Sequence, residues 1–135
     1  MELSDASRVL AGILCLSLVT VETGGALMFR IVGGRQEATP IQQSFFRAGH
    51  AHAGVYLILG LVAQVLVDAT TLTGPAEWVA RTFVPIAALL LPGGFFLSVS
   101  RPGATEPNRL VALVPAGAVV LAIGLATLGI GLLAA

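Results

Sequence analysis

The stretch LVALVPAGAVVLAIGLATLGIGLLAA fills positions 110 to 135 and contains no charged residue. It is longer than the roughly 20 apolar residues that an α-helix needs to cross a bilayer core of about 30 Å. We therefore expect a membrane span over 109–135. The rest of the chain agrees, because 56% of the 135 residues are hydrophobic and only 10% are charged, against about a quarter in soluble domains. The sequence predicts an integral membrane protein whose first partner is the lipid bilayer.

Three further segments are long and apolar enough to cross a membrane, over about 8–32, 50–72 and 77–100. The first is interrupted by Glu22 and has acidic residues at its head instead of a basic cluster, so we interpret it as a retained helix and not a signal peptide. Short connections make consecutive helices antiparallel neighbours. We expect one domain over 1–135, an all-α, up-down four-helix bundle with short loops.

Helices in lipid pack through small residues, which let backbones come close. For the fourth span we expect a packing face drawn from Ala118, Ala122, Ala126, Gly117, Gly124 and Gly131. In the third span, Pro85 and Pro92 each remove a backbone hydrogen bond and favour a bend. We expect the bundle to be most irregular at Pro92-Gly93-Gly94.

The arginines predict how the chain is oriented. With four spans, the two termini and the middle connection share one side of the membrane, and loops one and three share the other. Arg8 and Arg81 fall on the first side; five fall on the second, namely Arg30, Arg35, Arg47, Arg101 and Arg109. Basic residues are enriched on the cytoplasmic side. We expect a bacterial plasma-membrane protein with both termini outside, loops one and three in the cytoplasm, and Trp78 at the outer interface.

A helix start precedes the second span. Thr39, Pro40 and Gln42 match a capping box with proline at the first helical position, so a helix should begin at Pro40. A helix running unbroken from there to 72 would be about 50 Å long. We therefore expect 40–48 to lie at the cytoplasmic interface as an interfacial helix, bent at Gly49, and His50 and His52 to lie at the membrane boundary.

Six polar residues in or near these spans are candidate site residues. His50 and His52 are two apart, so on a helix they point about 200° away from each other and a shared metal site is not expected. Glu22 lies mid-span, where a carboxylate must be protonated or paired and face the interior. We expect it within hydrogen-bond reach of one histidine. The alternatives are a protonated acid bonded to backbone or threonine, and histidines that anchor at the headgroups. Further buried polar candidates are Thr23, Arg47 and Gln64, whereas Asp68 should be solvated near the outer end.

The segment His50-Ala51-His52, followed by Gly54 and Gly60 in an apolar helix, resembles small four-helix membrane proteins related to subunit I of the haem–copper oxidases. The resemblance implies that His50 or His52 is an axial haem ligand. No other helix of the chain has a histidine, and the 200° offset prevents one helix from supplying both ligands, so a second ligand would have to come from a homodimer.

Three functions fit these features. We favour a non-enzymatic accessory subunit of a larger membrane complex, because the loops are short and no serine–histidine–acid set, paired catalytic carboxylates or phosphate-binding glycine loop is present. The alternatives are a haem-binding or redox-associated protein using His50 or His52, and a small proton-coupled transporter using Glu22. Partners would be other membrane subunits or a second copy. Nucleic acid is not expected, because the net charge is zero and there is no basic tail.

Overall fold

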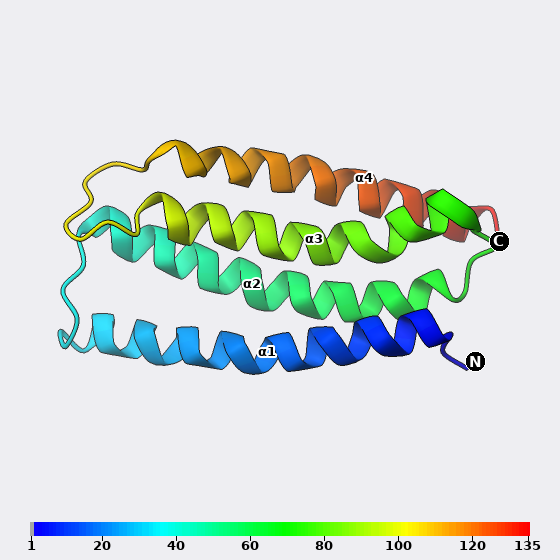
Figure 1. Ribbon diagram of the computed structural model, residues 1–135, viewed down its shortest axis with the longest axis horizontal. Helices are drawn as coiled ribbons and strands as arrows, with labels where there is room; N and C mark the ends of the chain where they lie inside the picture. Colours follow the sequence, from blue (N-terminus) through cyan, green and yellow to red (C-terminus); the bar gives the residue numbers. More distant parts are fainter. Residues whose placement is uncertain (1) are drawn as a thin grey trace.

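The computed structural model describes residues 2–135, and in this part of the chain every regular element is helical. The order is α1 (Asp5–Val32), α2 (Pro40–Val67), α3 (Gly74–Ser98), the 3₁₀ turn η1 (Arg109–Ala112) and α4 (Leu113–Leu133). Consecutive helices run antiparallel, with both termini and the α2–α3 connection at one end (Figure 1). Within residues 2–135, four helices are long and apolar enough to cross a membrane, as in a multi-pass membrane protein. The prediction of an all-α, up-down arrangement of four helices is confirmed.

α2 begins where the capping box placed it. The hydroxyl of Thr39 accepts from the backbone N–H of Gln42 at 3.3 Å, and the side-chain oxygen of Gln42 accepts from the backbone N–H of Thr39 at 3.0 Å. The side-chain amide of Gln42 also donates to the carbonyls of Val99 and Arg101, both at 3.0 Å. These bonds fasten the start of α2 to the end of α3.

The expected interfacial helix over 40–48 is not a separate element. α2 continues without interruption from Pro40 to Val67, so 40–48 forms its first turns. Gly49 does not bend the helix. It allows α2 and α3 to come close, because a Cβ there would stand 2.9 Å from an edge carbon of Phe96. The aromatic pairs Phe46–Phe96, stacked at 5.8 Å, and Phe45–Phe95, edge-on at 5.6 Å, pack α2 against α3 at this level.

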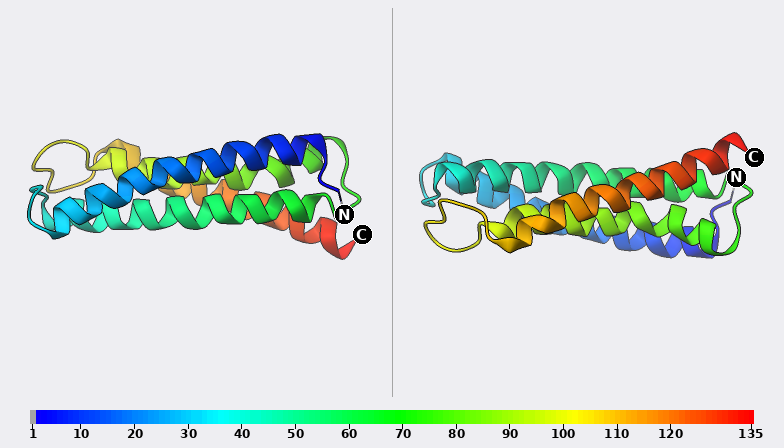
Figure 2. Two further views of the ribbon diagram at one scale, coloured as in Figure 1. Left: turned by 90° about the horizontal axis from the view of Figure 1, so that it is seen from below. Right: turned by 90° about the horizontal axis from the view of Figure 1, so that it is seen from above.

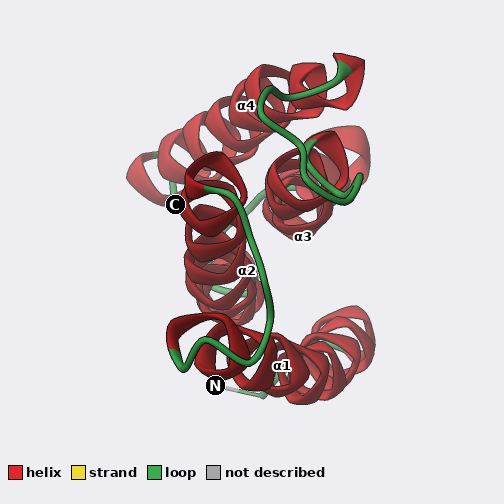
Figure 3. Cartoon of the chain, turned by 90° about the vertical axis from the view of Figure 1, so that its left-hand side faces the viewer, coloured by secondary structure: helices red, strands yellow, loops and turns green. Residues whose placement is uncertain are grey.

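The four helices are unequally packed. α3 packs along both α2 and α4, whereas α1 lies against α2 at the edge of the array. Seen from the end, α1 and α4 lie on opposite sides of α2, and α3 sits beside α2 and α4 (Figure 3). Seen from below, α1 runs at a slant across α2, and seen from above, α4 runs at a slant across the helices behind it (Figure 2). α1 also contacts α3 through side chains, among them a small apolar cluster of Leu14, Leu57 and Ala88.

Glycines bring α3 and α4 together. A Cβ at Gly117 would stand 2.8 Å from the Cγ of Leu91, and one at Gly124 would stand 2.7 Å from the Cβ of Phe83. The alanine half of the expected packing face was wrong, because Ala118, Ala122 and Ala126 are exposed while Gly117, Gly124 and Gly131 are buried. Residues at four-residue spacing share a face, and here that face points away from α3.

The Pro92-Gly93-Gly94 segment lies inside α3, which is continuous from Gly74 to Ser98 with both prolines in it. Gly94 marks a close approach, since a Cβ there would come within 2.9 Å of the backbone nitrogen of Val114. The glycine therefore makes room for the start of α4. No interruption of the helix is seen there.

Candidate functional site

His50 faces α1. Its imidazole lies against Gly24 and Gly25, and a Cβ at Gly24 would stand 3.1 Å from the ring nitrogen Nδ1. The ring also borders a cleft of about 240 Å³ between α1 and α2. We call this the His50 cleft; the residues around it are Gly25, Met28, Phe29, Val32 and His50. The glycine pair is what allows the imidazole to lie directly on the α1 backbone.

His52 faces α3 instead. Its Nδ1 is 2.7 Å from the carbonyl oxygen of Ala48, one turn earlier on the same helix. Its ring packs 5.1 Å from the ring of Phe95 and 5.4 Å from that of Tyr56. The two histidines therefore have different neighbours. Within residues 2–135, no group of three or more histidine, cysteine or acidic side chains is placed to hold a metal ion.

Glu22 does not make the expected contact. Its side chain is exposed on α1, and no hydrogen bond joins it to either imidazole in the described part of the chain. α1 packs through the stripe that contains Ser7, Leu14 and Val21. Glu22 follows Val21 and is turned about 100° from that stripe, which is why it points away from the bundle.

Two more of the buried polar candidates are also on the surface. Thr23 is exposed, and its hydroxyl donates to the carbonyl of Thr20. Arg47 is exposed, and its Nε donates to the carbonyl of Gln43 at 3.3 Å. In both cases the side chain bonds to its own helix one turn back, so the bundle interior is not involved. The expectation that these side chains are buried was therefore wrong.

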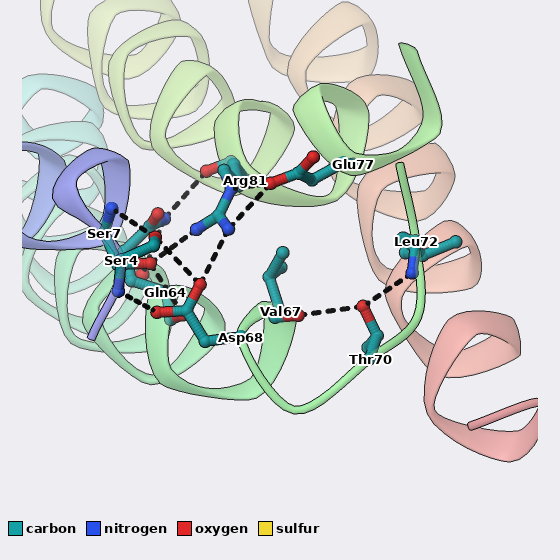
Figure 4. A network of polar contacts seen from close by, with 10 residues as sticks. Ser4, Ser7, Gln64, Val67, Asp68, Thr70, Leu72, Glu77 and Arg81 are labelled. Carbon is teal, nitrogen blue, oxygen red and sulfur yellow. Dashed lines mark hydrogen bonds and ion pairs between the residues drawn. The ribbon is translucent and has the colours of Figure 1, made fainter. Parts of the chain in front are cut away.

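The main polar site lies at the other end of the molecule, around Arg81 (Figure 4). Arg81 is 3% exposed. Its guanidinium pairs with Asp68 at 2.7 Å and with Glu77 at 2.8 Å. The prediction that Asp68 is solvated was wrong, because its side chain is only 5% exposed. The signal in the sequence was three charges around one short turn, with Glu77 and Arg81 at helical i, i+4 spacing.

The start of α1 is bound to the same residues. The backbone N–H and the hydroxyl of Ser4 donate to the two carboxylate oxygens of Asp68, each at 2.9 Å. The hydroxyl of Ser7 accepts from the guanidinium of Arg81 and donates to the backbone carbonyl of Gln64 at 3.1 Å. We call this set the Arg81 network: Ser4, Ser7, Gln64, Asp68, Glu77 and Arg81. It connects three helices at a single point.

Gln64 is the one predicted polar residue that is buried. It is completely enclosed, and its side-chain amide donates to the carbonyl of Arg81 at 2.8 Å and to that of Gly60 at 3.3 Å. Its side-chain oxygen has no partner within residues 2–135. Gln64 thus holds the backbone of α3 against α2 at the level of the Arg81 network.

The network shifts the acidity of Asp68. Burial alone would raise the pKa of this carboxyl, but hydrogen bonds from Arg81 and Ser4 outweigh burial and lower the pKa from 3.8 to about 2. Asp68 therefore stays ionised in the folded protein at any pH near neutrality. A carboxylate held in this way by an arginine and a serine is a structural anion.

Comparison with protein-family models, with curated proteins and with solved structures finds no match to this chain. The resemblance of the His50-Ala51-His52 segment to haem–copper oxidase relatives therefore stays a prediction.

Proposed function

We propose that the chain is a non-enzymatic subunit of a larger complex in the bacterial plasma membrane, and that α1 is its attachment surface. The observation that carries this is the exposed side chain of Glu22. Glu22 lies ten residues before Val32, the last residue of α1, and so about 15 Å from that end of the helix. A carboxylate facing lipid at that depth costs about 3 kcal/mol or more. A second protein that covers it removes this cost.

The partner that fits is a transmembrane helix of a different protein, with a hydrogen-bond donor or a basic group at the depth of Glu22. A second copy fits less well. A two-fold pair formed through this face would bring Glu22 toward Glu22 of the other copy, and like charges repel. The weak packing of α1 inside the molecule supports the same conclusion, because its outward side chains include Val9, Ile13, Leu16, Val19 and Phe29, all more than half exposed.

The test is purification of the tagged full-length chain from its native membrane in mild detergent. Cys15 is exposed and lies two turns from Glu22 on the same side of α1, so a lipid-soluble thiol crosslinker at Cys15 reports what covers this face. We expect a crosslink to another protein with a donor or basic residue within its span. Glu22→Leu should abolish it, while Glu37→Leu, an exposed loop change, should leave it intact. The proposal would be contradicted by a crosslink that forms only between two copies of this chain, or by a crosslink to another protein that persists in Glu22→Leu.

The proposed orientation places both termini outside and loops one and three in the cytoplasm. It rests on the five arginines at the loop one and loop three end, against Arg8 and Arg81 at the other. Arg81 is neutralised by Asp68 and Glu77, which strengthens the bias. In a Cys15→Ser background, Glu2→Cys should react with an impermeant thiol reagent applied to intact cells and Glu37→Cys should not. The reverse pattern would overturn the orientation.

Haem binding at His50 or His52 and proton coupling at Glu22 stay predictions. A Soret band in the purified protein that disappears on replacing one histidine would establish the first. For the second, the exposed position of Glu22 means that a proton pathway through this carboxyl would have to run between this chain and a neighbour.

A further inference from the structure

The His50 cleft combines one polar group with apolar walls. Among the residues that line the cleft, only His50 has a polar side chain. The others are Gly25, Met28, Phe29 and Val32. The cleft opens on the surface between α1 and α2, on helices long and apolar enough to lie in lipid. A ligand would therefore enter from the membrane and not from water.

The depth of His50 decides what can fill the cleft. α2 has 28 residues and is about 42 Å long, so it exceeds a 30 Å hydrocarbon core by about 6 Å at each end. His50 lies ten residues after Pro40, about 15 Å along the helix; with a core of about 30 Å centred on α2 it would lie about 9 Å inside the hydrocarbon, deeper than the membrane boundary expected from the sequence. Phospholipid chains carry no oxygen below their ester groups. An ordinary lipid therefore cannot bond to this imidazole.

The imidazole of His50 has no partner of its own. His52 uses Nδ1 toward the carbonyl of Ala48, whereas neither ring nitrogen of His50 is hydrogen-bonded within residues 2–135. An unsatisfied N–H in hydrocarbon costs several kcal/mol. The ring lies against Gly24 and Gly25, so its nitrogens are already beside the cleft without a ligand.

We propose that the His50 cleft binds a membrane-dissolved quinone. A ring carbonyl accepts the imidazole N–H, the flat ring lies against Phe29 and Met28, and the apolar tail stays in the bilayer. The volume of about 240 Å³ accommodates one such ring, and drug-sized sites of this kind are apolar with a few placed polar groups. This inference does not depend on Glu22, although Phe29 also belongs to the exposed face of α1 where the partner is proposed to bind.

The test uses the full-length chain in phosphatidylcholine nanodiscs free of quinone, titrated with a benzoquinone that carries a short two-isoprene tail. Because the chain has two histidines, ¹⁵N signals of labelled imidazole report binding at each. We expect a shift at His50 and about tenfold weaker binding in His50→Ala, the effect of losing one hydrogen bond in a site shielded from water. Gly25→Leu, which fills the cleft, should weaken binding as much.

His52→Ala is the matched control, since it removes the same side chain two residues away on another face, and it should bind normally. Glu22→Leu should also bind normally, which separates this proposal from the proposed function. His50→Gln keeps a donor and should retain part of the affinity, provided that the helical spectrum is unchanged. Undetectable binding to the unaltered chain, equal losses in His50→Ala and His52→Ala, or equal uptake of the tail without its ring would each overturn the proposal.

Discussion

α1 and α3 are similar in sequence character and opposite in role. Their mean hydropathies over the best membrane window are 1.8 and 1.6, yet 6% of that window is buried in α1 and 44% in α3. α3 is the centre of the bundle, fixed by glycine contacts to α4 and aromatic contacts to α2. α1 is attached to the rest mainly by the Arg81 network and the small cluster around Leu14. Apolar content therefore shows that a helix lies in the membrane, but not whether protein or lipid surrounds it.

The most damaging change should be Arg81→Ala. It leaves the carboxylates of Asp68 and Glu77 without their buried cation and removes a donor to Ser7. Breaking a buried ion pair on one side costs about 3–5 kcal/mol. We expect a loss of this size in the free energy of unfolding, measured by denaturant titration in detergent micelles. Arg47→Ala, at an exposed position, should change it by less than about 0.5 kcal/mol. Equal effects of the two changes would show that the network does not hold α1.

Gly124→Val should cause the second-largest loss of stability, because it disrupts the packing of α4 on α3 and does not touch α1. A Cβ at Gly124 would stand 2.7 Å from that of Phe83, and inserting carbon atoms into a packed contact costs about 1–3 kcal/mol. The same unfolding measurement should show this loss and increased hydrogen exchange in α3 and α4. Gly129→Val is the control on the same helix, because a Cβ there meets nothing within 4 Å. A larger loss in the control would mean that α4 is turned differently.

Lowering the pH should detach α1 from the bundle before it destabilises α3. The folded pKa of Asp68 is lowered from 3.8 to about 2, so the stability it contributes is present above the unfolded pKa and is lost as pH falls through the folded value. Unfolding free energy should decline between about pH 5 and pH 2, and hydrogen exchange should rise first in α1. Asp68→Asn should flatten this decline. If the unfolding free energy of Asp68→Asn still declined as steeply with falling pH, the acid sensitivity would come from other carboxyl groups.

Ser4→Ala should have the smallest effect. It removes the hydroxyl that donates to Asp68 and accepts from the backbone N–H of Ser7, while the backbone bond from position 4 to Asp68 survives. Loss of a helix N-cap costs about 1 kcal/mol. We expect faster hydrogen exchange in the first turns of α1 and no change in α3. Ser44→Ala, at an exposed position of α2, should leave both helices unchanged.

The sequence was sufficient for the helices and for one of their ends. Apolar length predicts four spans, and Thr39-Pro40-Gln42 predicts the start of α2, because both depend on local chemistry. Which face of a helix meets a neighbour depends on rotation about its axis. Glu22, Thr23 and the alanines of α4 were therefore placed on the wrong side, although the divergence of His50 and His52 followed from helical geometry alone.

The Arg81 network was not predicted from the sequence, for a different reason. Asp68, Glu77 and Arg81 sit around a turn, and charges near the end of a span are usually in contact with water. Here Ser4 and Ser7 at the start of α1 lie over them, and Ser4 is 64 positions away from Asp68. No local pattern in the sequence indicates that Ser4 and Ser7 come to lie on this turn.

The attachment of α1 also has a consequence for how the protein is assembled. α1 leaves the ribosome before α2 and α3, but Asp68 and Arg81, which bind Ser4 and Ser7, are made only after α2 and in the first turns of α3. During synthesis α1 must therefore wait in the bilayer with Ser4 and Ser7 unbound. α1 is therefore in place before the residues that fix its start have been made, and throughout that interval its surface is accessible to other membrane proteins.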